Sequence, residues 1–354
     1  MMIRVLAAML SVLAATLVAQ DRPDSTGRGA ARRAAREALF ADSTPLVLAL
    51  RFDHRAVFRD RDTLSRRRYD GRVIVRAGTG ADTVPVRVRP RGHFRLGANN
   101  CDFVPLRLEF RDRPSRGTLF DGQEALKLVT HCKTDVRDYD EYLLREHLVY
   151  RMHNLLTPLS FRSRLVEASY SDSLDGGWRV SRRALLIEDE ASVSRRAGGK
   201  VAEQRGAVWD NLDSAAVAQY ALFQYFIGGT DWSLSALHNV RVVQRPDGVY
   251  IPLAYDFDWT GMAQTPYAIP DPRLRVSRTR DRLFRGPCWS VDAFAGAVAG
   301  FTAQRAALLA LLDTPGLSEE YRTSTRRWIE EFFATVSDQK AFEKAIKRGC
   351  AVGT

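Results

Sequence analysis

The stretch FIGGTDWSLSALHNVRVVQRPDGVYIPLAYDFDWTG, residues 226–261, contains the pattern on which the predicted fold and function of this chain depend. Two apolar runs, Val240–Val243 and Val249–Leu253, are separated by the turn-forming triplet PDG, and this order predicts a β-hairpin. The second run leads directly into the letters YDFD. In an extended backbone Asp256 and Asp258 share one face. Two neighbouring carboxylates repel each other unless a cation or several donors lie between them.

The predicted hairpin brings two further oxygen ligands to the same place. Asp231 follows a helix-like run that stops at Ile227, and Asn239 directly precedes the first strand. Carboxylate and amide oxygens together favour Mg²⁺ or Mn²⁺. The same residue types serve phosphoryl transfer, in which one carboxylate orients the acceptor hydroxyl while an amide and a second carboxylate hold the metal. The alternative is structural: Asp231 caps a turn, and Asp256 and Asp258 pair with some of the many arginines.

The beginning of the chain has the composition of a secretory signal peptide. Arg4 precedes the apolar run Val5–Val18, and the small residue Ala19 precedes the first acidic residue. We expect cleavage near Ala19-Gln20 and export to the periplasm or the medium. The apolar run is short for a membrane span, and we expect no transmembrane segment.

Basic residues outnumber acidic ones: 53 Lys and Arg against 42 Asp and Glu give a net charge of +11. This excess favours an anionic partner such as a phosphorylated compound or an acidic envelope component. A solvated basic surface without a partner is the alternative. No nucleic-acid-binding motif accompanies the charge, so no nucleic acid partner is expected.

Four cysteines in an exported chain predict two disulfides, for which three pairings are possible. We favour the local pairs Cys101–Cys132 and Cys288–Cys350. No CxxC spacing occurs, and a structural zinc site is not expected.

The order of apolar patterns predicts strands first and helices later. Alternating runs predict strands at 45–52, 72–76, 84–89, 106–110, 126–129, 164–170 and 178–187, and helical spacing predicts helices at 138–156, 215–227, 291–312, 317–334 and 337–348. The predicted organisation is a signal peptide at 1–20, a polar segment at 21–43, a β-rich lobe at 44–193, a connection at 194–207, and a helical lobe at 208–354 that carries the acidic hairpin 231–261.

Several motifs between residues 84 and 261 resemble those of one known family. They are VRVRPRG (86–92), LRLEF (106–110), LKL (126–128), LRE (144–146), LLIE (185–188), HN (238–239) and IPLAYDFD (251–258). On these motifs the chain resembles the spore-coat CotH-like kinases, a divergent secreted branch of the kinase-like fold. It differs from them at Tyr255, where the family usually has Trp, and at 93–96, where the family has a Gly-hydroxyl element.

The resemblance implies an α+β, two-lobed, atypical protein-kinase-like fold. Its β-rich N-lobe would hold one long helix, and its mainly helical C-lobe would carry the catalytic hairpin. Asp231 would be the catalytic carboxylate. Asn239 and Asp256 would be metal ligands, with Asp258 as the competing assignment.

A kinase also needs a lysine on the nucleotide phosphates that is tied to a glutamate, and the resemblance makes Lys127 with Glu146 the candidates. The function implied is an exported, Mg²⁺- or Mn²⁺-dependent kinase that moves a phosphoryl group from ATP to a protein or carbohydrate hydroxyl. Two alternatives stay open. One is a catalytically inactive kinase-like envelope protein that binds an anionic polymer or partner, and the other is a metal-dependent phosphodiester hydrolase.

Overall fold

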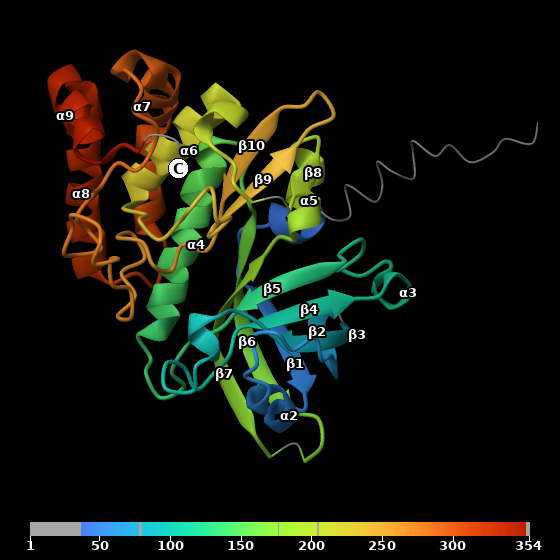
Figure 1. The fold of residues 1–354 in the computed structure, drawn as a ribbon. Coiled ribbons are helices and arrows are strands. Elements are labelled where there is room, and N and C mark those ends of the chain that lie inside the picture. The colour runs from blue at the N-terminus through green and yellow to red at the C-terminus, as the bar shows by residue number, and fades with distance from the viewer. Residues whose placement is uncertain (1–36, 78–79, 176, 204, 352–354) are drawn as a thin grey trace, which may run out of the picture.

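The computed structural model describes residues 37–77, 80–175, 177–203 and 205–351. The predicted signal peptide and residues 21–36 of the polar segment lie outside the described residues. A β-barrel occupies one side of the molecule and a group of helices the other (Figure 1).

Seven strands close into a barrel in the order β1-β2-β3-β4-β5-β7-β6. They are β1 (Leu46–Phe52), β2 (Tyr69–Ala77), β3 (Gly80–Pro90), β4 (Leu106–Phe110), β5 (Ala125–Val129), β6 (Ser163–Asp172) and β7 (Arg179–Ile187). Neighbouring strands are antiparallel except at the closure, where β1 and β6 run parallel with Leu48 opposite Ala168. This closure pairs both edges of β1, so the barrel does not expose it as an edge strand.

The alternation of side chains along the strands explains the interior of the barrel. In β3, Val84, Val86 and Val88 are buried in the barrel core, whereas Arg87 and Arg89 alternate with them on the outer face. Successive side chains of a strand point to opposite faces, so an apolar-polar alternation buries one face only. The alternating Val-Arg pattern therefore suits a barrel with a solvated outer wall.

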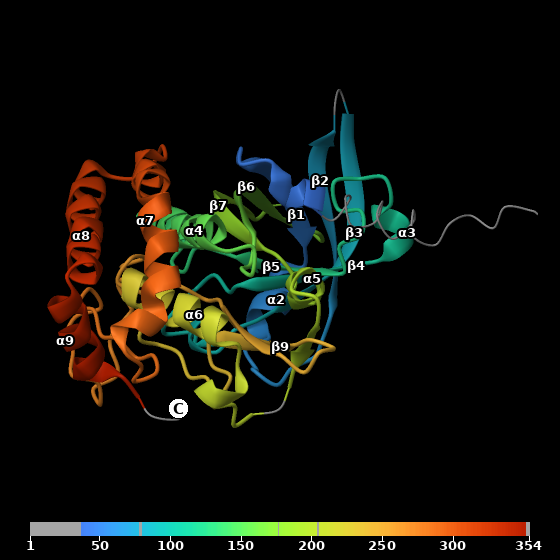
Figure 2. The ribbon, with the colours of Figure 1, turned by 90° about the horizontal axis from the view of Figure 1, so that it is seen from above.

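One part of the barrel wall is apolar on both faces. Leu186 of β7 belongs to the core inside the barrel, whereas Leu185 and Ile187 belong to a second, larger core outside it. The helix α4 (Tyr139–Leu156) covers this wall and contacts the C-terminal helices with its other side (Figures 1 and 2). The second core thus joins barrel and helices through α4.

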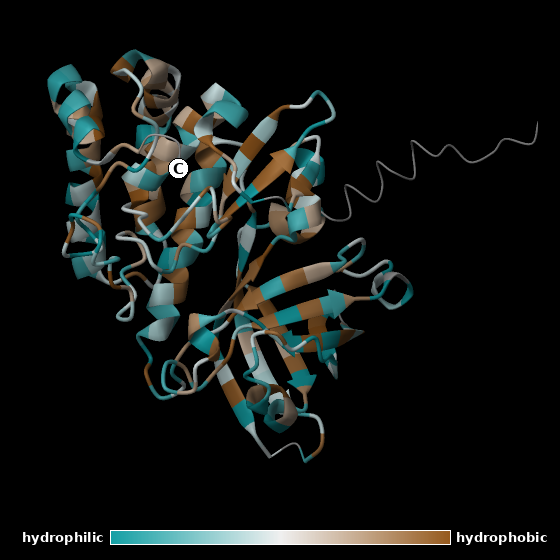
Figure 3. Ribbon diagram, viewed as in Figure 1, coloured by the Kyte–Doolittle hydropathy of each residue, from teal (hydrophilic) through white to brown (hydrophobic). Residues whose placement is uncertain are grey.

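Side-chain caps begin three of the four remaining long helices among the described residues. The four are α6 (Ser214–Ile227), α7 (Ala295–Ala310), α8 (Glu319–Ser337) and α9 (Gln339–Gly349), and α7 is the one without such a cap. Asp213 caps the start of α6 by accepting from the Ala216 amide, and Gly228 ends it with a left-handed φ of 62°. Figure 3 shows brown, apolar residues in both α6 and α4, and the two helices are in contact where the Phe223 ring stacks on the His153 ring with centroids 3.9 Å apart.

A second sheet has the strand order β10-β9-β8. It consists of β8 (Lys200–Ala202), β9 (Val240–Gln244) and β10 (Tyr250–Ala254), all antiparallel. The β9–β10 pair is the predicted hairpin, which is confirmed. The shorter helical elements are α2 (His54–Arg59), η1 (Phe94–Leu96), α3 (Asp112–Ser115), α5 (Glu190–Arg196), η2 (Trp209–Asn211), η3 (Val291–Phe294) and η4 (Leu311–Asp313).

The expected two-lobed kinase-like fold is wrong. The region expected to form a β-rich lobe is a closed mixed barrel, and β8, which lies in the expected connection 194–207, adds a third strand to the hairpin of the expected helical lobe. The reason is the parallel pairing of β1 with β6, which joins segments more than a hundred residues apart. Parallel partners need a long connection, and strand patterns in a sequence carry no information on which distant strands meet.

Both favoured disulfides are present. Cys101 pairs with Cys132, and Cys288 pairs with Cys350. The first lies beside the barrel and the second fastens the end of α9 to the loop before η3. Two disulfides indicate an oxidising, exported environment.

One helical stretch in the described chain, Val291–Asp313, is long and apolar enough to cross a membrane by length and composition alone. Its side chains Phe294, Phe301 and Leu308 belong to the larger core, and 17% of its most apolar window is buried. The expected absence of a transmembrane span stays a prediction.

Candidate functional site

The β9–β10 hairpin sets the position of two of the predicted ligands. Ala254 lies opposite Val240 at the end of the ladder. One step further the Tyr255 amide donates to the Asn239 carbonyl oxygen at 3.2 Å, so Asn239 is held close to Asp256. The turn of the hairpin therefore brings Asn239 and Asp256, which are far apart in the sequence, close together in space, as predicted.

Asn239 and Asp256 both adopt the left-handed backbone region, with φ of 52° and 64°. Asn and Asp tolerate this region better than other side-chain-bearing residues, although each still carries a conformational cost. Backbone strain of this kind gathers at ligand-binding and active sites, where the surrounding structure enforces it. The neighbouring Asp256 amide is fixed by donating to the Tyr150 hydroxyl at 3.1 Å.

Asp231 is held by contacts on every side. His238 Nε2 lies 3.0 Å from Asp231 Oδ1, and Asn239 Nδ2 donates to Oδ2 at 3.0 Å and to the main-chain oxygen at 2.7 Å. Arg285 donates to the carbonyl oxygens of the residues on either side, Thr230 and Trp232. The hydrogen bond that the His238 ring donates to the Asp231 carboxylate raises the pKa of His238. Asp231 and His238 thus form a pair that can accept and hold a proton.

Two further acidic residues, Asp258 and Glu146, lie deeper in the protein. Asp258 is buried and its Oδ2 accepts from the Tyr267 hydroxyl at 2.8 Å. Burial and the neighbouring Asp256 raise the pKa of Asp258 to about 7. Glu146 of α4 is also buried, and burial, followed by Asp258 and Asp256, raises its pKa well above the usual range.

Glu146 has an unsatisfied atom. Its Oε1 is buried without a hydrogen-bond partner among the described residues. Burying a carboxyl oxygen without a partner costs several kcal/mol by transfer arguments. A proton or a cation near Asp256 and Asp258 would relieve this cost.

Two arginines face the acidic groups from the barrel side. Arg91 precedes η1 and Arg95 lies within it, and both line one cavity of about 300 Å³ with Asp231, Asp256 and Asp258. Arg95 is 8% exposed, its Nη2 contacts the Thr130 carbonyl oxygen, and its Nε is without a partner in the described chain. Neither arginine forms an ion pair closer than 4 Å with the described carboxylates. Neither guanidinium charge is therefore neutralised by a direct ion pair within the described chain.

The cavity continues into a larger groove. Asp231, His238 and Trp259 line both the small cavity and a neighbouring one of about 950 Å³. Arg273 and Arg285 lie along the larger groove. Asp231 is thus located where a molecule in the groove would meet a group bound in the small cavity.

The predicted site residues separate into two groups. Asp231, Asn239, Asp256 and Asp258 line one cavity, as the sequence predicted. Glu146 lies beneath this cavity, close enough to Asp256 and Asp258 to shift its pKa.

The expected Lys127–Glu146 ion pair is wrong. Lys127 Nζ lies 2.9 Å from Glu190 Oε1, and Glu190 also binds Arg241 at 3.1 Å. Lys127 is fully buried beneath the ring of Tyr255, 4.4 Å from its centroid. The cause is the direction of β5: Lys127 points out of the barrel toward α5 and β9, whereas Glu146 of α4 points toward the hairpin end.

Sequence reasoning missed Arg91, Arg95 and Tyr267 as members of the site. The density of arginines in PRGHFR, directly after a strand, was the available signal. It was insufficient because arginine is common throughout this chain, and only the fold selects the two that face the carboxylates.

The donor set was tested against a divalent metal. Among the residues that the structure describes, no group of three or more His, Cys, Asp or Glu side chains could hold a metal as it stands. The donor types nevertheless suit Mg²⁺ or Mn²⁺, since the side chains of Asn239, Asp256 and Asp258 line one cavity and Mg²⁺ retains several waters.

Comparisons with known proteins give no family: no family model matches the chain, and no curated protein matches it by sequence.

Proposed function

We propose that this protein is an exported, metal-dependent enzyme of phosphoryl transfer, acting from a nucleotide such as ATP onto a hydroxyl of a protein or carbohydrate. The observation that carries the proposal is that three carboxylates, of which Asp258 is buried, and two arginines without an ion-pair partner among the described residues line one small cavity. Carboxylates alone suit a cation and arginines alone suit an anion. The two together suit a cation-bound phosphate.

Asn239, Asp256 and Asp258 are the residues that would hold Mg²⁺ or Mn²⁺. The Asn239 amide nitrogen donates to Asp231, which leaves its amide oxygen facing away from that contact. A bound divalent ion would supply charge neutralisation on the phosphate oxygens. It would also favour the ionised forms of Asp258 and Glu146, whose pKa values are raised.

Arg91 and Arg95 would orient the transferred phosphoryl group. A guanidinium matches phosphate oxygens in geometry and retains its charge when buried. Lys127 does not line the cavity and is assigned a structural role here.

Asp231 is the group assigned to accept the proton. The acceptor oxygen bonds to the terminal phosphorus while the bond from that phosphorus to the bridging oxygen breaks. The nucleoside diphosphate departs with that electron pair, and the hydroxyl proton passes to Asp231, where His238 is hydrogen-bonded.

The first test is the thermal stability of the mature protein with ATP and Mg²⁺ or Mn²⁺ together and with each alone. A ligand at a hundred times its dissociation constant should add ~2.7 kcal/mol. The expected shift requires metal and nucleotide together, disappears in Asp256→Ala, and persists in Asp247→Ala, a control at the other end of the hairpin where the carboxylate pairs with Arg245. Transfer of radiolabelled γ-phosphate to a hydroxyl acceptor should follow the same pattern. A stable, folded protein that shows neither shift nor transfer would refute the proposal.

A second candidate is a non-catalytic envelope protein that binds an anionic polymer, and the outer wall of the barrel favours it. Arg89 and Arg107 lie directly opposite each other on β3 and β4, an arrangement that is unfavourable without counter-charge. Arg68 is also close, and Glu109 contacts all three. Asp189 contacts Arg107 as well, so three cations share two carboxylates.

The two candidates differ in which residues binding requires. Polyphosphate is a suitable probe for binding of an anionic polymer. If the second candidate is right, the double variant Arg89→Gln with Arg107→Gln should lose polyphosphate binding, whereas Asp256→Ala should bind it as wild type does. The opposite pattern, with dependence on Asp256 and metal, supports phosphoryl transfer.

A further inference from the structure

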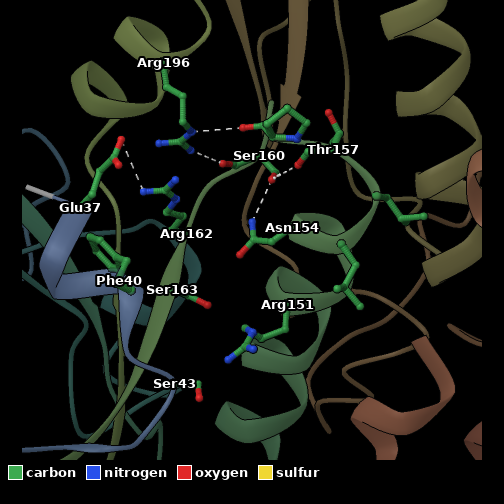
Figure 4. Close-up of a pocket in the computed structure, with 14 residues that line it drawn as sticks. Glu37, Phe40, Ser43, Arg151, Asn154, Thr157, Ser160, Arg162, Ser163 and Arg196 are labelled. Atoms are coloured by element: carbon green, nitrogen blue, oxygen red, sulfur yellow. Dashed lines mark hydrogen bonds and ion pairs between the residues drawn. The ribbon is translucent and has the colours of Figure 1, made fainter. Parts of the chain in front are cut away.

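A further cavity of about 530 Å³ lies away from the acidic site, between residues 37–43, the C-terminal half of α4 and the loop that leads to β6 (Figure 4). Its volume is within the range of small-molecule sites. Arg151 and Asn154 line it from α4, and Arg162 from the loop, with Glu37 and Phe40 on the facing side.

The cavity contains cations that its own carboxylates do not neutralise. Arg151 is half-buried, its guanidinium has no hydrogen bond or ion pair to any described residue, and Figure 4 draws no interaction from it. Arg162 is paired only loosely, with its Nη1 3.8 Å from Glu37 Oε1. Glu37 is the only acidic residue lining this cavity among those described.

A third arginine of the cavity is already saturated. Arg196 donates to both oxygens of Glu188, at 2.5 and 2.8 Å, and to the carbonyl oxygens of Pro158 and Ser160. It therefore forms part of the wall. The available charge is that of Arg151 and Arg162, opposed by one glutamate that is about half exposed.

The rest of the lining is polar with one aromatic side. Ser43, Thr157 and Ser163 contribute hydroxyl groups, and Phe40 contributes an aromatic ring. Guanidinium groups bind phosphate by paired hydrogen bonds. Hydroxyl groups bind the hydroxyls of a sugar, and an aromatic ring suits its C–H face.

We propose that this cavity binds a phosphorylated sugar, with Arg151 and Arg162 on the phosphate and the hydroxyl groups on the sugar ring. The site is separate from the acidic cavity, since none of its lining residues is shared with that cavity. Failure of this proposal would leave the proposed phosphoryl transfer untouched.

Calorimetric titration of the full mature chain in EDTA tests the proposal, with glucose 6-phosphate, glucuronate and glucose as probes. Glucose 6-phosphate should bind, glucuronate more weakly, and glucose not measurably. Arg151→Gln and Arg162→Gln should each weaken the binding about tenfold or more, as expected for charge-assisted hydrogen bonds. Glu37→Gln should strengthen it by about twofold to fivefold, the range of an exposed ion pair.

Two variants serve as matched controls. Arg195→Gln removes a neighbouring charge that does not line the cavity, and Arg91→Gln removes one from the acidic site. Both should bind glucose 6-phosphate normally. The proposal would be overturned if the wild-type chain does not bind glucose 6-phosphate, or if it binds glucose equally well. It would also be overturned if the affinity for glucose 6-phosphate is unchanged by substitution of Arg151, Arg162 and Glu37. If the arginine variants do not fold, Glu37→Gln still tests the proposal, because this variant is expected to bind glucose 6-phosphate more tightly than wild type.

Discussion

Replacing Asp258 with Asn should make the metal-free protein more stable at neutral and alkaline pH while removing its metal binding. Asp258 is buried beside Asp256 and Glu146, and its pKa is raised from 3.8 to about 7. Asn removes the charge and retains an oxygen that can accept from the Tyr267 hydroxyl. A carboxylate that is kept buried for function lowers the stability of the protein, which is a common trade-off between stability and activity.

The magnitude follows from linkage between proton binding and folding. A pKa difference of about 3 pH units corresponds to about 4 kcal/mol once the pH exceeds the folded-state value. This is an upper limit, since Asp256 and Glu146 repel Asp258 and relax when it is neutral. We expect Asp258→Asn to gain roughly 2 to 4 kcal/mol at pH 8.

The sign of the pH dependence is also fixed. An acid whose folded-state pKa is raised binds its proton more tightly in the native protein than in the unfolded chain. Its contribution is therefore most favourable below pH 4 and is lost as the pH rises from about 4 to about 7. The difference in stability between Asp258→Asn and wild type should grow across this window and stay constant above it.

Urea unfolding in EDTA at pH 4, 6 and 8 measures this difference, with Asp247→Asn as a control for loss of an exposed carboxylate. Addition of Mn²⁺ should stabilise wild type and leave Asp258→Asn unchanged. If the variant unfolds at the same urea concentration as wild type at pH 8, or at a lower one, the assignment of Asp258 as a destabilised, buried carboxylate is refuted.

Three further outcomes are expected. Asp231→Asn should retain the fold and metal binding but lower kcat by about 10² to 10⁴, the contribution of a positioned base, as measured by phosphoryl transfer. Lys127→Met should lower the unfolding free energy by roughly 1 to 3 kcal/mol in urea denaturation, because it removes one of the two cations that pair with Glu190 and leaves Arg241 as the remaining partner. Cys288→Ala with Cys350→Ala opens a loop of 62 residues and should cost about 4 kcal/mol in chemical denaturation; an unchanged midpoint would exclude a stabilising role for this disulfide.

The sequence by itself determined the local elements and the members of the acidic site. Val-Arg alternation located β3 and β4, helical spacing located α4 and α6, and the PDG turn between two apolar runs located the β9–β10 hairpin. These features depend on residues close in the chain, whose periodicity states which side is buried. The hairpin then brought Asn239 to Asp256 without further information.

Only the tertiary structure decided the architecture and the rest of the site. The parallel pairing of β1 with β6 closes the barrel, and no local pattern announces which strands meet at such a distance. The partner of Lys127 likewise depended on where α5 and β9 come to lie, and it is Glu190 in place of Glu146. Arg95 faces the carboxylates because of the fold alone, since an arginine that enters a site and one that remains on the surface have the same local sequence signal. Periodicity specifies which face of an element is buried, whereas the partner that covers that face is determined by the free energy of the whole packed chain.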